Sequence, residues 1–123
     1  MRYHQLKINV SLNDPEQGFS FRGDGDGAVV SFRDWCDQPV ELRFTNVYSF
    51  SCFYRNGYKR LPEGAMVEIT DSPEIAQLLE SQTAGPEDRL RHFVVSTNEE
   101  QWCEVIASSF SLQVDAAVPA DRG

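Results

Sequence analysis

The chain has few of the residues that most often build metal and redox sites. Its 123 residues include three cysteines and two histidines, and no two cysteines have the Cys-x-x-Cys spacing of zinc or dithiol sites. His4 and His92 are too few for a zinc site unless thiolate or carboxylate neighbours help, and no local spacing supplies them. We therefore expect free cysteines, no bound metal and no cofactor.

Long apolar runs and an excess of positive charge are also missing. No segment approaches the roughly 20 apolar residues of a membrane helix. The N-terminal MRYHQLKINVSL alternates polar and apolar residues, unlike the charged head and apolar core of a secretory signal. Eleven lysines and arginines stand against 19 acidic residues, and the resulting net charge of -8 repels phosphate-rich partners. We expect a cytoplasmic protein that binds neither nucleic acid nor membrane, and whose charge suits a basic protein partner.

Alternation of apolar and polar residues is the dominant pattern and predicts strands. In PVELRFTNV, Val40, Leu42 and Phe44 would face a core while the residues between them face water. The same pattern predicts strands near residues 6–12, 19–21, 28–35, 47–54, 66–70, 90–96, 101–107 and 110–114. Asn56 and Gly57 have the sequence of a tight hairpin turn.

One segment has the spacing of a helix. TDSPEIAQLLESQ offers Asp71 or Ser72 as a cap and a proline in the first turn, and its apolar residues share one face. The fold class we predict is mainly β, with α+β as the alternative. It is an antiparallel sandwich or open barrel of about eight or nine short strands, with one helix near residues 72–82 that packs against a sheet and lies across one face or plugs one end. We expect one domain over residues 1–115 and a flexible tail over 116–123.

The segment RGDGDG, residues 22–27, could be a calcium loop, an adhesion motif or a turn. A calcium loop starting at Asp24 would need a third carboxylate, a glycine and a bidentate glutamate, where the sequence has Ala28, Val29 and Trp35. An adhesion motif would need an extracellular protein. We therefore interpret the segment as a glycine-rich hairpin turn.

No catalytic motif is recognisable. The sequence lacks the Gly-x-Ser-x-Gly elbow and any phosphate-binding loop, and nothing in it nominates a nucleophile or a carboxylate partner for His92. His92 shares a strand face with Leu90 and Val94, which favours a packed histidine; proton transfer is the alternative. We nominate no catalytic residue.

Two segments resemble small uncharacterised bacterial proteins rich in β-structure, over residues 28–115. They are FRDWCDQPVELRFTNVYSF and RLRHFVVSTNEEQWCEVIASSF. Some proteins of that design act as immunity proteins against secreted toxins. The resemblance implies a single β domain without an assigned reaction, and it marks Trp35 and His92 as structural or binding residues.

These observations lead to three hypotheses. The first is a non-catalytic protein-binding module, immunity-like or accessory, and its predicted binding residues are Asp24, Asp26, Asp34, Trp35, Asp37 and His92. The second is a small-ligand binder with a cavity lined by Tyr48, Phe50 and Phe93. The third is an enzyme. The sequence leaves the oligomeric state undetermined.

Overall fold

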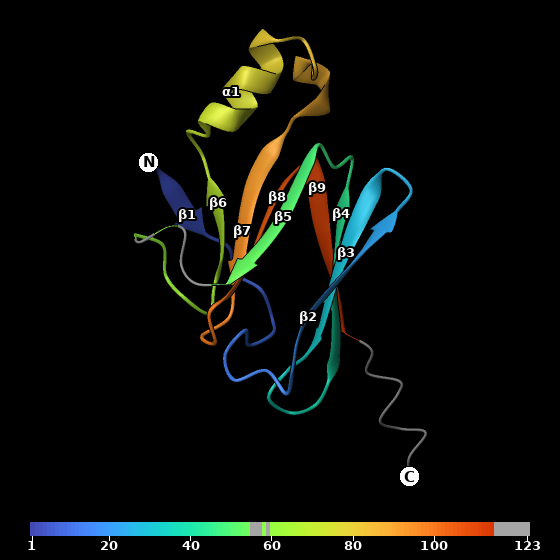
Figure 1. The fold of residues 1–123 in the computed structure, drawn as a ribbon, viewed down its shortest axis with the longest axis vertical. Coiled ribbons are helices and arrows are strands. Elements are labelled where there is room, and N and C mark those ends of the chain that lie inside the picture. Colours follow the sequence, from blue (N-terminus) through green and yellow to red (C-terminus); the bar gives the residue numbers. More distant parts are fainter. Residues whose placement is uncertain (55–57, 59, 115–123) are drawn as a thin grey trace.

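The computed structural model describes residues 1–54, 58 and 60–114, and these form two antiparallel sheets with one α-helix at one end (Figure 1). The strands are β1 (Tyr3–Gln5), β2 (Gln17–Asp24), β3 (Gly27–Arg33), β4 (Pro39–Thr45), β5 (Ser49–Tyr54), β6 (Met66–Ile69), β7 (Arg91–Ser96), β8 (Gln101–Ala107) and β9 (Ser109–Val114). The helices are α1 (Pro73–Glu80) and the short 3-10 helix η1 (Pro86–Asp88). The predicted mainly β class is confirmed.

Each sheet has a simple order. The larger has five strands in the order β1-β6-β7-β8-β5, and the smaller has four in the order β2-β3-β4-β9. The strands β1, β5, β2 and β9 are therefore the edges. Among the described residues no helix is long and apolar enough to span a membrane.

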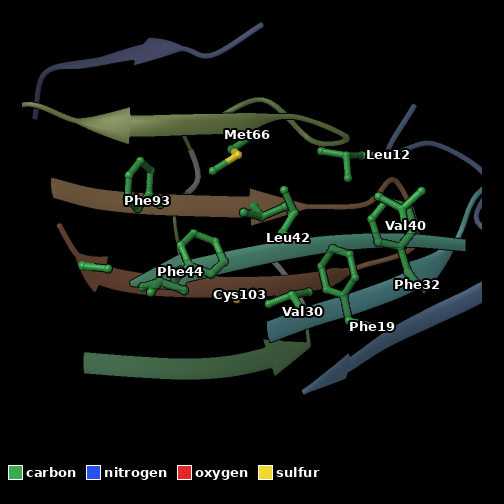
Figure 2. Packing of buried hydrophobic residues seen from close by; sticks show 13 residues of the cluster. Leu12, Phe19, Val30, Phe32, Val40, Leu42, Phe44, Met66, Phe93 and Cys103 are labelled. Carbon is green, nitrogen blue, oxygen red and sulfur yellow. The ribbon is translucent and has the colours of Figure 1, made fainter. Parts of the chain in front are cut away.

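The core lies between the sheets and follows the alternation seen in the sequence. Val40, Leu42 and Phe44 of β4 are all buried, and they face Phe93 and its neighbours on the larger sheet (Figure 2). Phe93 touches both Phe44 and Phe110, with ring centroids 5.6 and 5.2 Å apart. Buried aromatic and branched side chains from both layers therefore hold the sandwich together.

The larger sheet also buries its outer face, which the alternation did not predict. A second apolar cluster lies there, and its members are Leu61, Ala65, Val67, Ile69, Val94 and Trp102. Two of these residues, Leu61 and Ala65, come from the segment between β5 and β6, which are not neighbours in the sheet. This covering gives β7 an almost wholly buried pattern instead of an alternating one.

Three local predictions are either wrong or concern residues that the structure does not describe. The strand expected near residues 6–12 is not formed: β1 ends at Gln5, although Leu6, Ile8 and Val10 still pack against the core. The turn predicted at Asn56 and Gly57 lies outside the described residues, and the strand that precedes it, β5, pairs with β8. The tail predicted for 116–123 also lies outside the description.

The helix lies at one end of the strands, which is the second of the two predicted placements (Figure 1). None of its residues is buried, so the expected packing of its apolar face on a sheet is wrong. Ser72 is its N-cap, since the Ser72 hydroxyl accepts a hydrogen bond from the backbone N–H of Ile75 at 3.2 Å. Pro73 occupies the first turn, as predicted. The cap matters because it lies beside His92.

Candidate functional site

The acidic residues predicted for partner binding lie at opposite ends of β3. Asp24 is the last residue of β2, and Asp26 lies in the turn from β2 to β3. Asp34, Trp35 and Asp37 belong to the turn from β3 to β4. The seven residues of β3 separate the two turns by about 20 Å, at roughly 3.3 Å per residue. The sixth predicted residue, the histidine, belongs to the other sheet. The structure does not bring the six together.

The segment RGDGDG is the β2–β3 hairpin, as interpreted from the sequence. Asp24 pairs with Gly27, and Gly25 has a φ of 65°, a conformation that favours glycine. A side chain at position 27 would also meet the carbonyl oxygen of Phe44, only 2.5 Å from its Cβ. Within the described part of the chain, no group of three histidine, cysteine or acidic residues could hold a metal ion.

At the β3–β4 turn the aspartates stabilise the backbone. Asp34 is only 5% exposed, and its Oδ1 accepts hydrogen bonds from the backbone N–H groups of Cys36 at 3.0 Å and Gln38 at 2.8 Å. Asp37 forms an ion pair with Arg33 at 2.6 Å. Trp35, in contrast, is 60% exposed. Trp35 therefore offers a large apolar surface to a partner at this turn.

His92 lies at the centre of a buried polar network that sequence reasoning missed. Its Nδ1 is 2.7 Å from the hydroxyl of Ser72, and its Nε2 is 2.6 Å from Oε1 of Glu104. His92 comes from β7 and Glu104 from the adjacent β8, while Ser72 precedes α1. The histidine is fully buried and the serine is 8% exposed. The network therefore ties the start of the helix to the sheet.

Two further side chains complete the network. The hydroxyl of Tyr58 donates to Oε1 of Glu104 at 2.6 Å, and the carboxylate of Glu74 lies 3.1 Å from the Ser72 hydroxyl and 3.7 Å from Nδ1 of His92. The hydrogen bond from His92 holds the pKa of Glu104 below its usual value, although burial opposes this shift. Burial and the bond to Glu104 raise the pKa of Tyr58. The ionised carboxylate is thus the acceptor for both neighbours.

Ser72, His92 and Glu104 are also the residue types of a serine-hydrolase triad, in contact in that order. With Glu104 ionised, Nε2 of His92 carries a proton, and in the neutral ring Nδ1 is free to accept the proton of Ser72. The serine oxygen, however, already accepts the N–H of Ile75 as a helix cap. Its single proton also has a competing acceptor in Glu74. Both hydrogen bonds stabilise the first turn of α1, and they give Ser72 a structural role.

A second feature lies at the edge of the sandwich, where β2 passes over β5. A small pocket of about 90 Å³ opens there, and its lining residues are Phe19, Phe21, Cys52, Phe53, Tyr54, Gln101 and Trp102. Two of these side chains are large and exposed: Phe21 at 38% and Tyr54 at 76%. The Gln101 side chain accepts the backbone N–H of Phe19 at 3.1 Å and fixes β2 above the other sheet. We call this feature the edge pocket.

The ligand cavity expected around Tyr48, Phe50 and Phe93 is not assembled from those residues. Phe93 is fully buried in the core, and the hydroxyl of Tyr48 bonds to Asp88 at 3.0 Å at the helical end. Phe50 contacts Phe21 with ring centroids 5.4 Å apart. The alternation of aromatics over residues 48–54 did indicate an aromatic region. Its exposed member is Tyr54, which lines the edge pocket together with Phe21 of the other sheet.

Comparison with known proteins adds no relative: no family model, no curated protein and no solved structure matches this chain.

Proposed function

We propose that this chain acts by binding a basic protein partner, as an immunity-like or accessory protein of the bacterial cytoplasm that carries out no catalysis. The observation that supports the proposal best is the edge pocket, where two exposed aromatic residues from different sheets lie together. Aromatic side chains are enriched in protein interfaces, and neighbouring exposed apolar side chains often mark a binding site. The net charge of -8 favours a basic partner over an acidic one.

The proposal predicts capture that depends on salt. With the full chain as bait in extracts of its native cells, we expect one basic protein to be enriched at about 0.05 M salt. That protein should be largely lost at about 0.5 M, because screening weakens exposed charge pairs. The measurement is quantitative mass spectrometry of both eluates. Recovery of abundant proteins alone, or of an acidic protein at either salt concentration, would contradict the proposal.

A second candidate function is acyl transfer at Ser72, favoured by the contacts of Ser72, His92 and Glu104 in series. In that chemistry the serine oxygen attacks an acyl carbon while Nδ1 of His92 takes the hydroxyl proton. The bond between the acyl carbon and its leaving group then breaks, and the leaving group departs with the proton from His92. Ser72 also lines an open pocket of about 480 Å³ whose apolar residues include Ile75 and Leu79.

A fluorophosphonate probe separates the two candidates. Acyl transfer predicts near-stoichiometric labelling of Ser72 that is abolished in the Ser72→Ala and His92→Ala variants. The binding proposal predicts no labelling, because the serine oxygen is engaged as a helix cap. Intact-protein mass spectrometry reads the result, and Ser109→Ala, on the edge strand β9 of the other sheet, serves as the control substitution.

A further inference from the structure

We propose that the partner contributes an extended segment that pairs with the free edge of β5, places one apolar side chain in the edge pocket and carries basic side chains near both ends of the strand. This inference rests on the proposed function and specifies its mode of binding. Strand addition of this kind draws affinity from backbone hydrogen bonds and specificity from side-chain pockets.

The edge of β5 lacks the features that usually block strand pairing. Its sequence, SFSCFY, contains no charged residue and no proline, and its six residues pair with β8 in unbroken register. In contrast, β1 has only three residues, and β2 is interrupted by a register shift and carries Arg22 and Asp24. Charges, bulges and short length are the devices that protect edge strands. The edge of β9 is also uncharged, but it is β5 that contributes residues to the edge pocket.

The edge pocket suits a side chain rather than a small molecule. Its volume of about 90 Å³ is well below the roughly 300 Å³ at which ligand pockets begin. Three of its residues, Cys52, Phe53 and Tyr54, belong to β5 itself. A strand added to β5 would therefore run beside the pocket, and its apolar residue would bury against the aromatic rings.

Acidic residues lie at both ends of β5 and favour a basic occupant. At the first end, the carbonyl of Asp26 accepts the N–H of Val47 at 2.8 Å, which places the β2–β3 turn beside the start of the strand. At the other end, Tyr54 pairs with Gln101, which directly follows the exposed residues Glu99 and Glu100. Among the described residues, none of these three acids has an ion-pair partner. They remain available to lysine or arginine side chains.

The first test uses a library of displayed random peptides of about eight residues, selected against the full-length chain. We expect enrichment of peptides with one large apolar residue and with lysine or arginine toward both ends. On binding a selected synthetic peptide, backbone amides of β5 should exchange more slowly with deuterium, while those of β9 stay unchanged. Protection of β9 instead, or of neither strand, would overturn the proposal.

Matched variants then test the pocket and the charges separately. Tyr54→Ala should weaken peptide binding about tenfold or more, because it removes an exposed aromatic contact, whereas Tyr3→Ala, on the edge strand β1, should not. Asp26→Asn should weaken binding up to about fivefold, an effect that salt abolishes, and Glu80→Gln on the helix should have no effect. Equal binding by the Tyr54→Ala variant and the native chain would exclude the edge pocket.

The same variants distinguish failure of this inference from failure of the proposed function. If the basic protein captured from cells binds Tyr54→Ala as tightly as the native chain, the strand-addition mode is wrong and partner binding stands. If selected peptides protect β5 but no basic protein is ever captured, the edge is competent for binding and the proposed function is wrong. Loss of binding in both tyrosine variants would also exclude the pocket.

Discussion

Replacing Phe93 with alanine is expected to destabilise the protein by about 3–5 kcal/mol. Phe93 is fully buried between the sheets and contacts an aromatic ring of β4 and another of β9, so its removal leaves a cavity that three strands border. Domains of this size are commonly stable by about 5–15 kcal/mol. The variant should therefore unfold at a much lower urea concentration than the native chain.

Leu79→Ala is the control for this prediction. Leu79 is 41% exposed on the helix, and alanine favours helices, so the change in the free energy of unfolding should lie within about 0.5 kcal/mol. Both variants are measured by urea unfolding followed by tryptophan fluorescence and circular dichroism. A loss below about 1 kcal/mol for Phe93→Ala would mean that the two sheets do not pack around this residue.

Replacing Glu104 with glutamine is expected to remove a contribution to stability that depends on pH. The folded-state pKa of Glu104 lies below its ordinary value of 4.5, so its ionised form is favoured by folding. That contribution is fully present above the ordinary pKa and is lost as the pH falls through the folded-state pKa. At pH 7 the substitution should cost about 1–2 kcal/mol, because glutamine keeps the size but weakens the charge-assisted bond to His92.

The difference between the native chain and Glu104→Gln is measured by urea unfolding from pH 3 to pH 7. We expect it to be largest near neutral pH and to shrink steadily below about pH 4.5. Glu74→Gln is the matched control, because Glu74 lies on the exposed side of the same network, with a side chain 52% accessible. A difference that grows toward acid pH would contradict the assignment of Glu104 as the ionised partner of His92.

The sequence was informative wherever burial follows a strict alternation. Val40, Leu42 and Phe44 lie on the buried face as predicted, and the glycine-rich turn at residues 24–27 joins two paired strands. Residues 6–12 show the limit of this reasoning. Their alternate residues do pack on the core, but the backbone is irregular, because the chain makes its strand pairs with β6 only at residues 3–5. A pattern of burial does not by itself supply a hydrogen-bonding partner.

The polar network could not have been predicted, because its members are far apart in the sequence. Ser72 was recognised only as a possible helix cap, and His92 and Glu104 meet because β7 and β8 are neighbours in a particular register. The edge pocket depends in the same way on how one sheet lies over the other. The excess of acidic residues, in contrast, was evident from the composition. Nothing in the sequence indicated, however, that Asp34 would be buried in a turn.

Photo-crosslinking in native cells tests partner binding at the edge of β5 most directly. A photoreactive phenylalanine derivative is placed at position 54, or at position 3 as the control, since both native tyrosines are exposed on edge strands. We predict that position 54 forms an adduct with one basic protein and that position 3 does not. The same adducts from both positions, or no adduct from position 54, would contradict a partner site at this edge.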